Sequence, residues 1–173
     1  MYAYYWARGV SDGAYPSPQA YLEDVTDLLR GEVAELVRLG AGYVHVCRGN
    51  DANRYMARGG YEQLAEEVFP RTAADVLLLE YDDERSGGFE PLRHVSEDKV
   101  VVLGLVSTKR QERESEEELR VRIDEASSYV PLERLALSTQ CGFASVAKGN
   151  DLTAEQEERK LELVARVASQ VWG

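Results

Sequence analysis

A histidine and a cysteine two residues apart are the first candidates for chemistry in this sequence. His45 and Cys47 end an apolar run, and Gly49 and Asn50 follow them. In a β-strand, residues i and i+2 point to the same face, so the imidazole and the thiol are expected to project together. Imidazole nitrogen and thiolate sulfur are two of the ligands that tetrahedral zinc prefers. A buried cysteine beside a hydrogen-bonded histidine is the alternative that this pair alone leaves open.

Two further groups stand at the ends of apolar runs and favour the metal. Glu80 ends a run that begins at Val76, and Cys141 comes shortly after the run over residues 134–138. In parallel β/α folds, sites are built at the C-terminal ends of the strands. One histidine, two cysteines and one carboxylate would complete a zinc shell, or leave one position for a substrate thiol. Taken singly, Glu80 also fits a solvated strand end, and Cys141 a small residue in a tight turn.

The elements expected to position these groups alternate between helices and strands. Apolar spacing and capping boxes predict helices over residues 19–39, 61–69, 116–129 and from about 154 onward. Strands are expected over residues 43–47, 76–80, 100–106 and 134–138. This alternation is typical of α/β proteins with a parallel sheet built from β/α units of the TIM-barrel type. Four strands and four helices make half of an eight-stranded barrel, so we expect one partial-barrel domain over residues 1–173, with an irregular segment at 1–18.

Composition narrows the class of protein. The chain has 173 residues, a net charge of -11 and a pI near 4.7, which disfavours a nucleic-acid partner because phosphate binding needs a basic face. No apolar run approaches the roughly 20 residues of a membrane span, so no membrane partner is expected. Residues 1–8 lack the layout of a signal peptide, and two cysteines without export signals indicate reduced thiols in the cytoplasm. The acidic stretch at residues 82–85 is expected to be a solvated turn.

Taken together and in order, these segments resemble the cobalamin-independent methionine synthase family, in particular its C-terminal catalytic barrel and the shorter single-barrel relatives. The matching segments are residues 45–50, 79–82, 103–107, 138–143 and 149–153. The resemblance implies that Zn2+ is held by His45, Cys47, Glu80 and Cys141. It also implies transfer of a methyl group from a methylated folate to a thiol such as homocysteine. Ser107, in one of the matching segments, is the candidate for substrate binding.

Two hypotheses from different classes follow. The first is a zinc-dependent S-methyltransferase acting on a thiol. The second is a non-catalytic, zinc-binding half-barrel that serves as a structural or interaction module. Because four parallel strands leave two edges unpaired, either a second copy joins them to form a homodimer, or the N-terminal segment and first helix fold over the open face.

Overall fold

The computed structural model describes residues 13–51, 53–55, 58–144 and 146–173. It divides into two compact units, Met1–Gly42 and Tyr43–Gly173, and each is described by itself. Most of the predicted irregular segment at 1–18 lies outside the described residues. A single domain over residues 1–173 stays a prediction.

The first unit contains one long helix, α2 (Pro18–Arg38). Ser17 caps its N-terminus by accepting a hydrogen bond from the backbone N–H of Ala20 at 3.1 Å. Pro18 is the first residue of the helix, where a backbone N–H would have no partner within the helix, so the missing N–H of proline costs nothing. The helix predicted over residues 19–39 is confirmed within one residue at each end.

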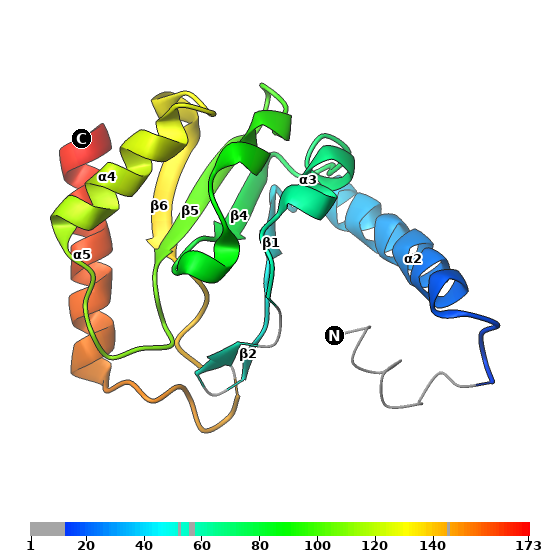
Figure 1. Cartoon of the computed structure of the whole chain (residues 1–173), viewed down its shortest axis with the longest axis horizontal. Coiled ribbons are helices and arrows are strands. Elements are labelled where there is room, and N and C mark those ends of the chain that lie inside the picture. The colour runs from blue at the N-terminus through cyan, green and yellow to red at the C-terminus, as the bar shows by residue number, and fades with distance from the viewer. Residues whose placement is uncertain (1–12, 52, 56–57, 145) are drawn as a thin grey trace. The chain divides into compact units, whose positions relative to one another are not determined.

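The second unit is built on a parallel sheet with the strand order β1-β4-β5-β6 (Figure 1). The strands are β1 (Tyr43–Val46), β4 (Val76–Glu80), β5 (Val100–Val106) and β6 (Leu135–Thr139). All three pairings are parallel, and they place His45, Leu78, Val102 and Ala136 side by side across the sheet. The predicted α/β class is therefore confirmed. A short antiparallel ribbon, β2 (Asn50–Asp51) with β3 (Arg54–Tyr55), was not predicted.

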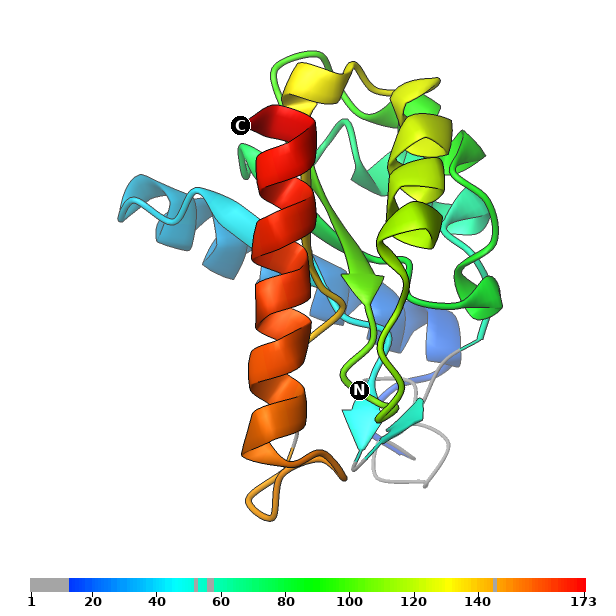
Figure 2. The same cartoon turned by 90° about the vertical axis from the view of Figure 1, so that its left-hand side faces the viewer.

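Among the described residues of this unit, two helices and three short 3-10 helices lie between the strands, and a third helix follows the last strand (Figures 1 and 2). The helices are α3 (Glu62–Val68), α4 (Glu116–Ser127) and α5 (Ala154–Trp172), and the 3-10 helices are η1 (Glu84–Ser86), η2 (Glu90–His94) and η3 (Leu132–Arg134). Both predicted capping boxes are present, Ser115 with Glu118 and Thr153 with Gln156. In the part of the chain that the structure describes, no helix is long and apolar enough to cross a membrane.

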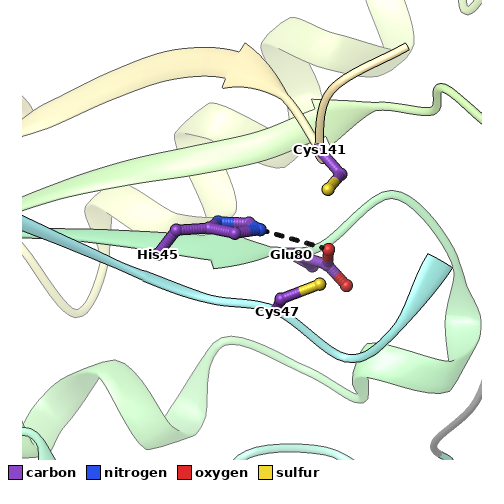
Figure 3. A group of neighbouring side chains, drawn as sticks. All are labelled: His45, Cys47, Glu80 and Cys141. Carbon is purple, nitrogen blue, oxygen red and sulfur yellow. Dashed lines mark ion pairs between the residues drawn. The ribbon is translucent and has the colours of Figure 1, made fainter. Parts of the chain in front are cut away.

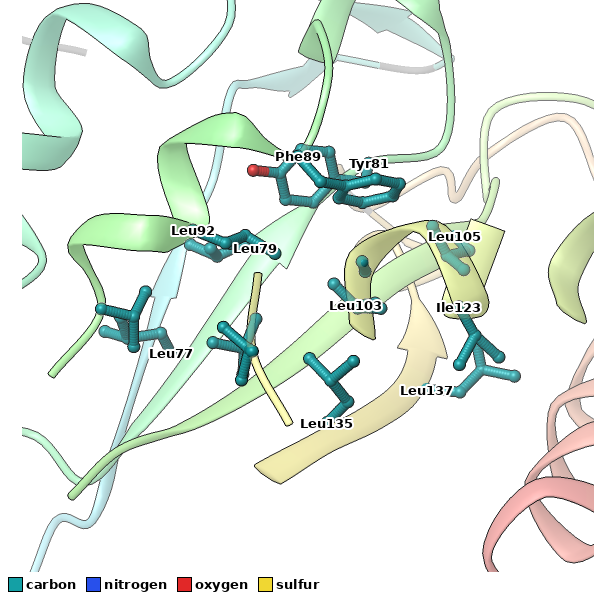
Figure 4. Packing of buried hydrophobic residues seen from close by; sticks show 14 of the residues in the cluster. Leu77, Leu79, Tyr81, Phe89, Leu92, Leu103, Leu105, Ile123, Leu135 and Leu137 are labelled. Carbon is teal, nitrogen blue, oxygen red and sulfur yellow. The ribbon is translucent and has the colours of Figure 1, made fainter. Parts of the chain in front are cut away.

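The hydrophobic core lies between one face of the sheet and the helices (Figure 4). Leu77, Leu79 and Leu103 point from the strands toward Phe89 of the η2 segment and Ile123 of α4, and all five side chains are buried. The opposite face is apolar but only half-buried, and it carries Val76, Leu78, Val100, Val102 and Ala136. We call it the open face. Because the side chains of a strand alternate between faces, every second strand residue belongs to it.

Candidate metal centre

Four candidate ligands come together at the C-terminal edge of the sheet (Figure 3). His45 lies on β1 and Cys47 just after it, Glu80 ends β4, and Cys141 follows β6. One ligand atom from each of the four residues lies within 4.8 Å of the ligand atoms of the other three. The structure thus brings together the whole set that the sequence singled out, from segments up to 96 residues apart (141 − 45).

Glu80 is the buried member of the set, with 1% of its surface exposed. Its Oε1 accepts a hydrogen bond from Nε2 of Gln140 at 3.0 Å and lies 3.5 Å from Nε2 of His45, and its Oε2 accepts one from the backbone N–H of Arg48 at 3.0 Å. Burial alone would raise the pKa of this carboxyl. The hydrogen bonds from His45, Gln140 and Arg48 outweigh it and hold the pKa below its ordinary value, so the carboxylate is ionised.

The two thiols differ in their acidity when no metal is present. Hydrogen bonding with Cys141, and then with His45, lowers the pKa of Cys47 to about 5. The same contact with Cys47 raises the pKa of the Cys141 thiol. Cys47 first and Glu80 second raise the pKa of His45 to about 9. The directions of these shifts favour the thiolate at Cys47 and the protonated forms of His45 and Cys141, so metal binding would release protons from the latter two.

Gly104 allows the strand ends to meet at this site. A Cβ atom at Gly104 would lie 2.9 Å from the carbonyl oxygen of Leu79 and 2.9 Å from Cα of Gln140, closer than such atoms approach. Only glycine therefore lets β4 and β6 approach β5 so closely at the level of Glu80. Sequence reasoning did not single out Gly104, although a glycine inside an apolar strand is a signal of close backbone approach.

Arg48 fixes the segment that carries Cys47. Its buried guanidinium donates to Oγ of Ser86 at 2.8 Å, to the carbonyl oxygen of Arg85 at 2.7 Å and to that of Gly59. These bonds tie the end of β1 to the loop after β4 and so hold the Arg48 N–H on Glu80. Sequence reasoning missed this role because the partners lie 11 to 38 residues away.

Ser107 and Asp82, the first residue of the acidic stretch after β4, belong to a second buried cluster. Ser107 donates from its hydroxyl to Oδ2 of Asp82 at 2.7 Å, and Nζ of Lys109 lies 2.8 Å from the same oxygen. The prediction that residues 82–85 form a solvated turn is therefore wrong for Asp82, which is 4% exposed because its charge is paired with Lys109. The hydroxyl of Ser107 contacts protein here, and its role toward a substrate stays a prediction.

Comparisons with known proteins agree on the family. The model of the family described as "Cobalamin-independent synthase, Catalytic domain" matches residues 44–168. Two uncharacterized proteins of Bacillus subtilis (strain 168), YxjG and YxjH, are 52% and 48% identical to the chain over 130 residues. That match covers 75% of this chain and 34% of each relative, so the chain spans about a third of the length of these curated relatives.

Solved structures show the same relationship. The putative vitamin-B12-independent methionine synthase from Listeria monocytogenes is 32% identical, with a TM-score of 0.51 over 76% of this chain and 35% of that one. A B12-independent methionine synthase from Shewanella sp. W3-18-1, solved in complex with selenomethionine, is 20% identical and shares the fold, with a TM-score of 0.59 over 75% of this chain and 38% of that one. The chain belongs to the cobalamin-independent synthase family, and its four parallel strands and their helices correspond to half of a TIM-barrel-like catalytic domain.

Proposed function

We propose that this chain binds zinc through His45, Cys47, Glu80 and Cys141 and takes part in transfer of a methyl group to a thiol. The methyl donor would be a methylated folate and the acceptor homocysteine or a similar thiol. The observation that carries the proposal is the convergence of four ligand atoms within 4.8 Å at the sheet edge of a member of this family.

The donor set fits zinc. Two thiols, an imidazole and a carboxylate are its usual protein ligands, at about 2.0–2.3 Å, which places ligand atoms about 3.3–3.8 Å apart around a tetrahedral ion. The spacing within 4.8 Å is close to this, so small side-chain movements would suffice. When bound, zinc would lower the pKa of an incoming thiol and so supply a nucleophile near neutral pH.

The residues of the chain supply orientation and access. Arg48 and Gln140 hold the two carboxylate oxygens of Glu80, so this ligand is oriented before any metal arrives. His45 lies in register with Leu78 on the open face, and Glu80, two residues after Leu78, points to the same face. A thiol and a methyl donor would therefore approach from the open face rather than from the side covered by helices.

Zinc content and methyl transfer, measured on the same purified chain, test the proposal. We expect about one zinc per chain and zinc-dependent formation of methionine from homocysteine and a methylated folate. A chain without zinc would overturn the proposal. Zinc binding without methyl transfer would favour the second function, a non-catalytic half-barrel.

That second function is favoured by the apolar open face and by β1 and β6, which are the edge strands of the sheet in the described part of the chain. Such edges and faces invite pairing with another chain. A homodimer would cover both, and sedimentation at micromolar concentration tests it: a compact monomer of 19.4 kDa that binds no hydrophobic dye would exclude the dimer. In either function the two cysteines must stay reduced to bind zinc, which fits the cytoplasm as the proposed compartment.

A further inference from the structure

We infer that Gln140 is a positioning residue, which orients the carboxylate of Glu80 for the metal and is itself oriented by Thr108. The inference rests on the proposed function, because it assigns roles around the proposed zinc site. It concerns residues that neither the sequence analysis nor the comparisons assign to the site.

The amide of Gln140 has only one orientation that satisfies its surroundings. The residue is 1% exposed, and its Oε1 accepts hydrogen bonds from the backbone N–H of Thr108 at 3.2 Å and from the Thr108 hydroxyl at 2.9 Å. Its Nε2 donates to Oε1 of Glu80 at 3.0 Å. Turning the amide over would set its NH2 group against the Thr108 N–H and its oxygen against a carboxylate, and buried polar groups left without partners are costly.

Thr108 is itself fixed. It is fully buried, and its carbonyl oxygen accepts a hydrogen bond from Nδ2 of Asn150 at 2.9 Å. A continuous series of hydrogen bonds therefore links Thr108, in the segment after β5, to Gln140 after β6, and Gln140 to Glu80 at the end of β4. Gln140 packs against β5 at Gly104, where a Cβ atom would collide with the Gln140 backbone.

The consequence for Glu80 follows from the capacity of a carboxylate. Each oxygen has two lone-pair directions, and Gln140 and Arg48 each occupy one. The second direction on Oε2 is left for a metal, the second on Oε1 faces Nε2 of His45 at 3.5 Å, and the plane of the carboxylate is set by two fixed donors. Gln140 also directly precedes Cys141, so one backbone segment places a ligand and the partner of another ligand together.

Zinc affinity by chelator competition, together with the visible spectrum of the cobalt-loaded chain, tests the inference without an activity assay. Gln140→Leu should lower zinc affinity about 10- to 100-fold and alter the cobalt bands, because ligands deprived of their hydrogen-bond partners lose orientation. Thr108→Val should act in the same direction with a smaller loss, and Thr108→Ser, which keeps the hydroxyl, should restore the parent values. Leu137→Val on the covered face of β6 is the matched control and should leave both readouts unchanged.

A double-mutant cycle with Glu80→Gln decides whether Gln140 acts through Glu80. If it does, the double variant should bind zinc no more weakly than Glu80→Gln alone. Additive losses, or parent-like affinity in Gln140→Leu, would overturn the inference while leaving the zinc site intact. A parent chain without zinc would overturn the proposed function and the inference with it. If Gln140→Leu does not fold, the comparison of Thr108→Val with Thr108→Ser decides the question, and equal affinities would overturn the inference.

Discussion

The two faces of the sheet are built from the same apolar residue types and yet differ in their surroundings. Leu77, Leu79 and Leu103 on the covered face are at most 1% exposed, whereas Leu78 and Val102 on the open face are half-buried. His45 and Glu80 lie on the open face, whereas the aromatic side chains of Tyr81 and Phe89 lie on the covered side. Stability therefore comes mainly from one face and the site is carried by the other, within single strands whose side chains alternate. Substitutions on the two faces should have separable effects.

Removal of the thiol ligands should have the largest effect on the site. Cys47→Ser and Cys141→Ser are each expected to lose most of the zinc, because thiolates are its strongest ligands in this set. Glu80→Gln should lose less, since it replaces the weakest ligand. Metal analysis of the purified variants measures this. Full zinc occupancy in the double cysteine variant would contradict the assignment, and the free energy of unfolding of the metal-free chain serves as the control for the covered face.

The convergence of the four candidate ligands could be predicted from the sequence because each lies at or just past the end of an apolar strand. The end of a strand can be recognised in the sequence from the end of an apolar run, and parallel strands place their C-terminal ends at the same edge of the sheet. The capping boxes of α4 and α5 were predictable for the same reason, since all their hydrogen bonds are local. The partners of the ligands were not predictable. Gln140 lies 60 residues from Glu80 and Lys109 lies 27 from Asp82 (109 − 82), so no local pattern reports their contacts.

Truncation of one leucine on each face compares them directly. Leu103→Ala removes a side chain enclosed by the core and should lower the free energy of unfolding by about 2–5 kcal/mol. Leu78→Ala, the matched variant on the open face, should cost less because the side chain is partly in water already. Urea unfolding at low protein concentration measures the free energy of unfolding of both variants. Equal losses in a monomeric sample would mean that the open face is covered within the chain itself.

Gly104→Ala should disturb both faces, because the glycine lies where three strands meet. The added methyl group would overlap the Leu79 carbonyl and the Gln140 backbone, and overpacking of this kind costs about 1–3 kcal/mol. Zinc affinity should fall together with stability, since the ends of β4 and β6 would move apart. Gly142→Ala is the control: it lies next to Cys141, but a Cβ there meets nothing within 4 Å. A loss of zinc affinity in the control and none in Gly104→Ala would contradict this role.

The smallest expected effect comes from the N-terminal cap of α4. It tests whether the stability of the covered face is independent of the metal site on the open face. Oγ of Ser115 accepts a hydrogen bond from the Glu118 N–H at 3.1 Å, and Glu118 returns one by accepting from the Ser115 N–H at 3.1 Å. Ser115→Ala removes the first bond and also the one that the Ser115 hydroxyl donates to Oε2 of Glu118 at 2.9 Å, and because this turn is reached by solvent, water replaces part of both. We expect a loss of about 1 kcal/mol in the free energy of unfolding and partial recovery in Ser115→Thr.

Zinc affinity of the same variant shows whether the two faces are coupled. Ser115 follows Glu114, whose carboxylate accepts a hydrogen bond from the backbone N–H of Ser107 at 3.0 Å, so the cap is connected to the end of β5. Ser107 in turn bonds Asp82 rather than any of the four ligands. The weakened cap should therefore change stability and leave zinc affinity at the parent value. A parallel fall in zinc affinity would show that the loop after β5 transmits strain from the helix to the site, and the separation of the two faces would then be wrong.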